Sequence, residues 1–132
     1  MKTIEVRSAA REELIDITAA VGGAVRESSF EKGFCLVFVP HTTAGVLINE
    51  NADPDVTADI LMALQKIVPD TLPFRHGEGN SAAHVKATLV GSSVTVPVEG
   101  GRLDLGTWQA VYFAEFDGPR RRRVYVGLIP SP

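Results

Sequence analysis

Apolar and polar residues alternate along much of this chain, which is typical of β-strands with one buried face. The expected strands are Thr3–Arg7, Gly33–Pro40, Gly45–Ile48, Ser92–Val98, Leu103–Leu105, Thr107–Phe116 and Arg122–Ile129. The run Gly33–Pro40 is almost wholly apolar, which predicts a strand that is covered on both faces. The segment Glu13–Thr18 is either a further strand or the lead into a helix.

A helical period replaces the alternation after Asp53, which is a good N-cap and is followed by Pro54 at the first helical position. The apolar residues at helical spacing predict a core stripe made of Val56, Ile60, Leu64 and Ile67. Pro69 ends this helix, and a loop rich in proline and glycine follows.

Two other segments favour short helices. Thr18 is a candidate cap for the first one, although the pair Gly22–Gly23 weakens it. Ser81–Val90 is a helix capped by Asn80 or Ser81, or else a strand. Strands that segregate from a few helices indicate an α+β fold, and 132 residues fit one domain spanning residues 1–132.

The composition limits the classes of binding partner and the cellular compartment that we expect. The net charge is −3, so we expect no nucleic-acid partner and no attraction to an anionic membrane. No apolar run approaches the roughly 20 residues of a membrane-spanning helix. The single cysteine, Cys35, lies in an apolar run and is expected to be buried and inert. A reduced, cytoplasmic setting follows from this cysteine usage and from an N-terminus without the features of a signal peptide.

The chain has only three histidines, His41, His76 and His84, and none lies inside an apolar run. Three imidazoles with a water molecule form a known open zinc site, in which the metal activates the water. The spacing matches no standard zinc motif, so three separate hydrogen-bonding histidines are the alternative.

Polar side chains gather where two neighbouring strands end. Thr42 and Thr43 either bond to nearby backbone as strand-end residues, or hold a phosphate and orient His41. Asn49 and Glu50 end the next strand. Glu50 is a candidate general base or magnesium ligand, because Mg²⁺ prefers one or two carboxylates together with substrate phosphates. We expect both strand ends to face one shared pocket with the histidines.

Further polar groups are candidates for binding a phosphorylated ligand. The loop RHGEGN precedes a possible helix start, where backbone N–H groups can cradle phosphate. The four arginines Arg120–Arg123 must alternate between the two faces of a strand, so that some face a pocket, unless they form a solvated edge. The segment LGTWQ contains the lone tryptophan, which is either core or ligand-binding. The candidate substrate-binding residues are Thr42, Thr43, Asn49, Arg75, Asn80, Trp108, Gln109, Arg120 and Arg122.

Four segments together resemble successive blocks of the YjbQ family, formerly the uncharacterised UPF0047 group. They are HTTAGVLINENADPDV, RHGEGNSAAHVKATLVGSSVTVPV, GRLDLGTWQAVYF and EFDGPRRRRV, in matching order and spacing. The block GRLDLGTWQ is the most specific. The resemblance covers most of the chain from about His41 onward, and the N-terminal third carries little of it.

The resemblance implies a β-sandwich-like core of mostly antiparallel strands with flanking helices, usually assembled as a homotrimer. It also implies weak activity as a secondary thiamine-phosphate synthase, which joins a pyrimidine methyl diphosphate to a thiazole phosphate. In that enzyme His41, Glu50 and His84 would be catalytic, with Mg²⁺ as a possible cofactor. A zinc hydrolase with His41, His76 and His84 as metal ligands is one alternative. A non-catalytic trimeric ligand-binding protein is the other.

Overall fold

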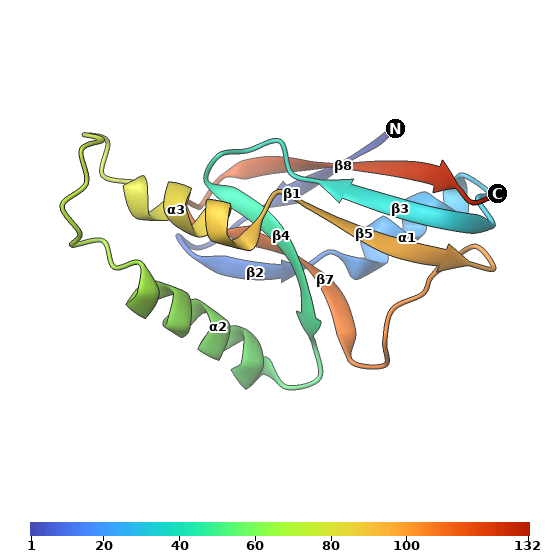
Figure 1. The fold of residues 1–132 in the computed structure, drawn as a ribbon, viewed down its shortest axis with the longest axis horizontal. Coiled ribbons are helices and arrows are strands. Elements are labelled where there is room, and N and C mark those ends of the chain that lie inside the picture. The colour runs from blue at the N-terminus through green and yellow to red at the C-terminus, as the bar shows by residue number, and fades with distance from the viewer.

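The computed structural model describes residues 1–132 as two antiparallel sheets and three helices, which is an α+β fold (Figure 1). The larger sheet has the strand order β1-β8-β3-β5-β6, and the smaller sheet has the order β2-β7-β4. The strands are β1 Lys2–Arg7, β2 Glu13–Asp16, β3 Lys32–Phe38, β4 Ala44–Glu50, β5 Ser93–Glu99, β6 Arg102–Leu103, β7 Gln109–Glu115 and β8 Arg121–Pro130. The helices are α1 Thr18–Glu27, α2 Pro54–Ile67 and α3 Ser81–Val90.

The main core lies between the two sheets. Alternate residues of the larger sheet, such as Val37 and Val124, pack against alternate residues of the smaller sheet, such as Val46 and Phe113. Helix α1 adds Val21 and its neighbours to the same cluster. The alternation seen in the sequence therefore corresponds to one buried face per strand.

Helices α2 and α3 lie beside the other face of the smaller sheet (Figure 1). Ala83 and Ala87 of α3 contact Ala114 and Phe116 in a second, smaller apolar cluster. Small side chains on α3 let the helix approach β4 and β7 closely. This approach brings one end of α3 to the candidate site described below.

Strand β3 differs from the expectation of a strand covered on both faces. Its residues alternate between buried and exposed, and Phe34 on the outer face is 43% exposed. The reason is that the larger sheet packs on the smaller one with its inner face only. Cys35 points to this inner face and is fully buried, and burial raises the pKa of its thiol to about 11. The expectation of a buried thiol is confirmed.

Helix α2 begins as expected. The side chain of Asp53 accepts a hydrogen bond from the backbone N–H of Asp55 at 2.9 Å, and Pro54 occupies the first turn. The predicted core stripe is wrong, because no residue of α2 is buried and Ile67 is 64% exposed. The helix contacts only the smaller cluster, through residues such as Leu64, rather than the core between the sheets.

The structure decides between the alternatives left open for Thr18, Glu13–Thr18 and Ser81–Val90. Thr18 is the first residue of α1 and not its cap; Asp16 accepts hydrogen bonds from the backbone N–H of Thr18 at 2.9 Å and from its hydroxyl at 2.6 Å. The Thr18 hydroxyl in turn accepts from the backbone N–H of Val111, which ties α1 to β7. Ser81–Val90 is a helix, and Glu13–Asp16 is a strand. None of the three helices combines the length and the apolar composition needed to cross a membrane.

A close backbone approach joins β4 to the end of α3. The backbone N–H of Val46 donates to the carbonyl oxygen of Gly91 at 3.1 Å. A Cβ atom at Gly45 would lie 2.5 Å from that same oxygen, so only glycine fits at this position. This contact sets the position of α3 relative to the segment that precedes β4.

Candidate functional site

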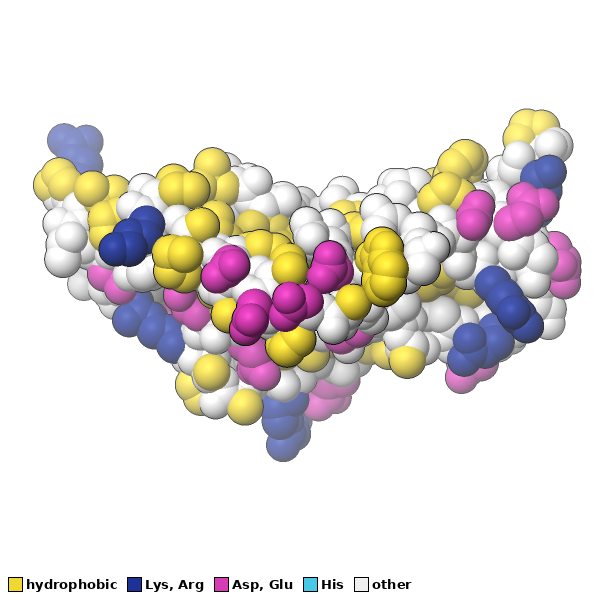
Figure 2. Space-filling view, turned by 90° about the horizontal axis from the view of Figure 1, so that it is seen from below, with side chains coloured by type: hydrophobic (Ala, Val, Ile, Leu, Met, Phe, Trp, Pro, Cys, Tyr) yellow, Lys and Arg dark blue, Asp and Glu magenta, His cyan; other side chains and the backbone are white.

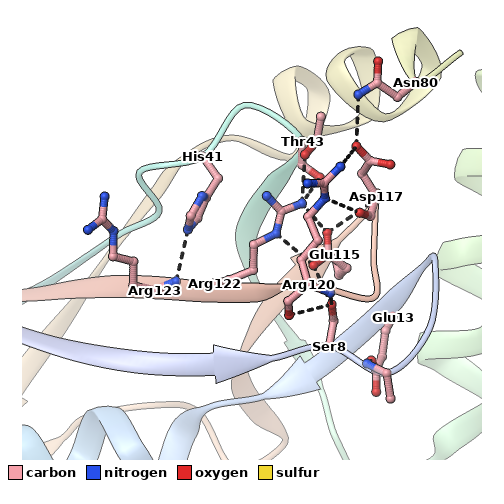
Figure 3. Close-up of polar contacts among 11 residues, drawn as sticks. Ser8, Glu13, His41, Thr43, Asn80, Glu115, Asp117, Arg120, Arg122 and Arg123 are labelled. Carbon is pink, nitrogen blue, oxygen red and sulfur yellow. Dashed lines mark hydrogen bonds and ion pairs between the residues drawn. The ribbon is translucent and has the colours of Figure 1, made fainter. Parts of the chain in front are cut away.

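His41 lies in the segment between β3 and β4 and is held against β8. Its Nε2 atom accepts a hydrogen bond from the backbone N–H of Arg123 at 3.0 Å (Figure 3). That nitrogen therefore carries no proton, and the neutral ring holds its proton on Nδ1. Burial, and next the positive charge of Arg122, lower the pKa of His41 below its ordinary value. His41 is thus a neutral imidazole near pH 7, with one N–H to donate.

A buried ion pair lies beneath this segment. Glu115 is fully buried (0% exposed), and Arg122 donates to it through Nε at 2.9 Å and through Nη2 at 2.5 Å (Figure 3). The hydroxyl of Ser8 donates to the same carboxylate at 2.7 Å. Burial on its own raises the pKa of Glu115, but the hydrogen bonds from Arg122, Ser8 and the backbone of Asp117 lower it overall. The carboxylate therefore stays ionised, and the pair fastens β7 to β8.

The same arginine reaches the strand end that carries the threonines. Arg122 Nη2 donates to the hydroxyl of Thr43 at 2.8 Å, and both residues are buried. Thr42, its neighbour, is exposed to the solvent. Thr43 and Arg122 are thus committed to the fold, while Thr42 remains open to a ligand.

Asp117 clamps two further polar side chains. Its Oδ2 atom accepts from Asn80 Nδ2 at 3.0 Å and from Arg120 Nη2 at 3.1 Å (Figure 3). Arg120 Nε also donates to the carbonyl oxygen of Asp117 at 2.8 Å. The remaining amide atom of Asn80, Oδ1, is buried and has no hydrogen-bond partner in the chain. Buried polar atoms without a partner are rare, and a functional role is one of their explanations.

Helix α3 supplies the second histidine. His84 is half-buried at the end of the first turn of α3, four residues after the N-cap residue Asn80. The ring of His76 meets it edge to face, with 5.6 Å between the ring centroids. The packing of α3 brings His84 to the same pocket as His41, whereas His76, which meets His84, does not line that pocket.

These side chains surround an open cleft of about 640 Å³, here called the histidine cleft. Its polar lining includes His41, Thr42, Thr43, Glu78, Asn80, His84, Ser92, Asp117, Arg120 and Arg122. His41 and His84 also line an adjoining depression of about 460 Å³. On the far side of His84, Arg75 and His76 line a third one. The volume suits a small molecule, and the lining offers it mostly polar contacts.

Four predicted site residues lie elsewhere, so the expectation of one shared pocket is wrong. Strand β4 continues to Glu50 rather than ending at Ile48, which places Asn49 and Glu50 at the opposite end of the strand from Thr43. Seven residues of strand span about 20 Å at roughly 3.3 Å per residue. Glu50 faces Gln109 in the register of β4 and β7.

Trp108 lies near Asn49 and Glu50 and is not a core residue. Trp108 is 63% exposed at the start of β7, and Gln109 accepts a hydrogen bond from the backbone N–H of Gly106. Figure 2 shows acidic side chains gathered at the centre of this face, where β4 ends and α2 begins, and no histidine is visible on it. Exposed members of this acidic end include Asp53, Asp55 and Asp59.

The three histidines do not form a metal-binding group within one chain. No cluster of three or more histidine, cysteine or carboxylate side chains has the geometry to hold a metal ion. His76 and His84 are adjacent, but Nε2 of His41 is occupied by the N–H of Arg123. The donors of a single chain therefore do not fit an open three-histidine zinc site.

Two carboxylates that hold the arginines of this region, Glu115 and Asp117, were not predicted from the sequence. Asp117 reads as part of a turn, and Glu115 reads as the end of a strand, yet together they hold Arg120 and Arg122. The two-residue period of the strand could have identified which arginine of Arg120–Arg123 is buried. In β8 alternate residues face opposite sides, so Arg122 is buried while Arg121 and Arg123 are exposed. A buried arginine requires a carboxylate, but the sequence does not say which one.

Comparisons with known proteins place the chain in a family. Residues 2–131 match the family model described as UPF0047 protein YjbQ-like. A UPF0047 protein of Methanocaldococcus jannaschii is 50% identical over 125 residues, which cover 95% of this chain and 91% of that protein. The UPF0047 protein YugU of Bacillus subtilis is 48% identical over 130 residues, which cover 98% of each.

Solved structures show the same fold. A crystal structure of an uncharacterized conserved protein of the YjbQ/UPF0047 family from Clostridium acetobutylicum is 52% identical, with a TM-score of 0.95, and covers 98% of this chain and 100% of that one. A YbjQ-like protein of unknown function from Sulfolobus solfataricus is 34% identical, with a TM-score of 0.94, and covers 98% of this chain and 96% of that one. These proteins share one two-sheet α+β fold, which defines the class to which this chain belongs. The chain belongs to the YjbQ/UPF0047 family, which confirms the resemblance of the sequence blocks.

Proposed function

We propose that this protein is a small-molecule enzyme that binds a phosphorylated substrate in the histidine cleft. The observation that carries the proposal is the pairing of His41, a neutral imidazole with one N–H to donate, with His84 across a polar cleft. Arg120 and Asn80, both held by Asp117, add further donors. Donors fixed in advance bind an anion without the cost of ordering them.

The reaction class that we propose is formation of thiamine phosphate, as the family resemblance implies. A nitrogen lone pair of the thiazole phosphate attacks the methylene carbon of the pyrimidine methyl diphosphate. A C–N bond forms, the C–O bond breaks, and diphosphate leaves with the electron pair. This chemistry needs no nucleophile from the protein. It needs donors for the charge that develops on the leaving group, and we assign that role to His41 and Arg120.

The roles of the remaining residues follow from their positions. His84 and Arg75 would hold the second phosphorylated substrate, because they line the depression on the far side of the cleft. Glu50 has no role in this proposal, since it lies at the opposite end of β4. Mg²⁺ would enter with the diphosphate, and its contribution would be to offset the negative charge of that group.

The test is an assay of thiamine phosphate formation from the two phosphorylated precursors, with and without added Mg²⁺. We expect His41→Gln and His84→Gln to lower kcat/KM at least about tenfold, which corresponds to about 1.4 kcal/mol of transition-state stabilisation. Glu50→Gln is the matched control and should leave kcat/KM unchanged. Equal turnover by wild type and both histidine variants would contradict the proposal.

The zinc hydrolase has weaker support, because one chain does not assemble three suitable ligands. Elemental analysis of untagged protein tests it directly. The hydrolase proposal predicts one zinc per chain in the wild type and its loss in His41→Ala. That result would favour the hydrolase over the transferase, with zinc ligands from more than one subunit.

We further propose that the chain forms a homotrimer. The support is that α2 and α3 leave large apolar side chains exposed, among them Met62, Ile67 and Leu89. Such surfaces are typical of interfaces. Light scattering coupled to size exclusion should give three times the mass of one chain, and the mass of one chain would exclude the trimer. The non-catalytic alternative predicts a trimer without any turnover in the assay above.

A further inference from the structure

A separate depression of about 380 Å³ lies on the other side of His41 from the histidine cleft. Its lining consists of Thr3, Glu5, His41, Arg121, Arg122 and Arg123. The proposed function does not use Thr3, Arg121 or Arg123. The register of β1 and β8 brings these residues together, because Glu5 lies opposite Arg123 and Thr3 lies opposite Tyr125.

The three arginines of this depression differ in how their charges are used. Arg122 is buried and bound to Glu115. Arg121 forms an exposed ion pair with Glu5 at 3.4 Å. Arg123 has no carboxylate within ion-pair distance. The depression therefore contains one positive charge that nothing in the chain offsets.

The guanidinium of Arg123 is also held in place. It lies over the ring of Tyr125, 5.8 Å from the ring centroid, and Tyr125 stacks on Phe38 with 6.3 Å between centroids. A guanidinium within about 6 Å of an aromatic ring centroid is attracted to the ring, and its N–H groups can still donate to an anion. The backbone N–H of the same residue donates to His41 (Figure 3). One residue thus orients His41 and presents a free cation beside it.

The geometry points to a second anion-binding subsite at Arg123, with Arg121 and Thr3 as further donors. Its ligand would be a phosphate or diphosphate group, because a guanidinium edge matches two phosphate oxygens. His41 and Arg122 line both this depression and the histidine cleft, so the two subsites share a wall. The substrate class is therefore a pair of phosphorylated molecules, or one molecule with two phosphate groups. This pairing rests on the proposed function, whereas the Arg123 subsite itself does not.

Calorimetric titration of the protein with inorganic pyrophosphate tests the subsite. We expect two binding events per chain. Arg123→Gln should abolish one event, or weaken it at least about tenfold, since a charge-assisted bidentate contact is lost. Arg120→Gln should remove the other event instead. Arg102→Gln, which changes an exposed arginine on β6, is the control and should preserve both.

Glu5→Gln is expected to strengthen pyrophosphate binding, whereas Arg123→Gln is expected to weaken it. Removal of this carboxylate frees Arg121 and should strengthen the Arg123-dependent event about threefold, as expected for an exposed charge. Two unchanged events in Arg123→Gln would overturn the subsite. A single event that depends on Arg123 but not on Arg120 or His41 would support the subsite and count against the histidine cleft. The failures of the two proposals are therefore distinguishable.

Discussion

The two ends of strand β4 differ in burial and charge, although one short block, HTTAGVLINEN, contains both. At the first end Thr43 is buried and bound to Arg122, beside a neutral histidine and clamped donors. At the other end Asn49 is exposed and Glu50 half-buried, with the exposed Asp53 close behind in the sequence. The difference teaches that a polar motif can belong to two separate regions when a strand joins its halves. Residues that are close in the sequence are then separated in space by the length of that strand.

The strongest test of this contrast is Glu115→Gln. The substitution leaves the buried guanidinium of Arg122 without its countercharge, and breaking a buried pair in this way costs about 3–5 kcal/mol of unfolding free energy. Urea unfolding followed by circular dichroism measures the loss. Glu50→Gln, at the other end of β4, should change stability by less than about 0.5 kcal/mol. A loss below about 1 kcal/mol for Glu115→Gln would mean that both ends tolerate change equally.

A smaller loss is expected from Gly45→Ala. Its Cβ atom would meet the carbonyl oxygen of Gly91 at 2.5 Å, so β4 and α3 must move apart, and such overpacking costs about 1–3 kcal/mol. Gly127→Ala on β8 is the matched control, because nothing lies within 4 Å of its Cβ position. Thermal unfolding compares the two variants. Equal melting temperatures would show that the close approach of α3 does not position the site.

The clamp at the cleft end predicts a binding effect with little change in stability. Unlike Glu5, Asp117 positions two donors, Arg120 and Asn80, through three hydrogen bonds. In Asp117→Asn the loss of these oriented donors should outweigh the removal of one negative charge, so pyrophosphate should bind the histidine cleft about three- to tenfold more weakly. Asp59→Asn on the exposed face of α2 is the control at the acidic end. Titration calorimetry measures both. General charge alone would make both variants bind pyrophosphate slightly more tightly, so unchanged or tighter binding by Asp117→Asn would contradict the clamp.

The smallest expected effect is a pH dependence that depends on His41. Because its pKa is lower in the folded chain, the unfolded chain takes up a proton first as the pH falls. Its stabilising contribution is therefore complete above the ordinary value of 6.5 and is lost as the pH drops from 6.5 through the folded pKa. Unfolding curves between pH 7.5 and pH 5 should show this decline in the wild type and less of it in His41→Gln. Parallel curves would show that His41 titrates as it does in the unfolded chain.

The depressed pKa of Glu115 acts over a lower range. Its contribution is present above the ordinary value of 4.5 and is lost as the pH falls below it, so extending the same series below pH 4.5 separates the two groups.

Much of the fold could be predicted from local patterns. The positions of most strands and the Asp53 cap of α2 are confirmed. Ser81–Val90, for which a helix and a strand were both open, is a helix. The errors have a common cause. The uncovered face of β3 and the exposed stripe of α2 both depend on which elements pack against them, and an apolar pattern predicts burial without identifying the element that covers it.

The candidate site could be predicted only in part. His41, His84, Asn80 and Arg120 lie together as expected, but Glu50 does not. Single residues next to a strand end cannot be assigned to a pocket until the length of the strand is known.

The sequence by itself determined the elements, their order and the family, because caps, turn residues and periodicity act over a few neighbouring residues. It also supplied the chemical inventory of histidines, amides and arginines. The tertiary structure alone decided which of them meet. Contacts such as Arg122 with Glu115, or the N–H of Arg123 with His41, join residues that lie on separate strands or 82 positions apart. Such contacts form only where the two sheets and α3 pack, and that packing selects one arrangement from many that the same local patterns allow.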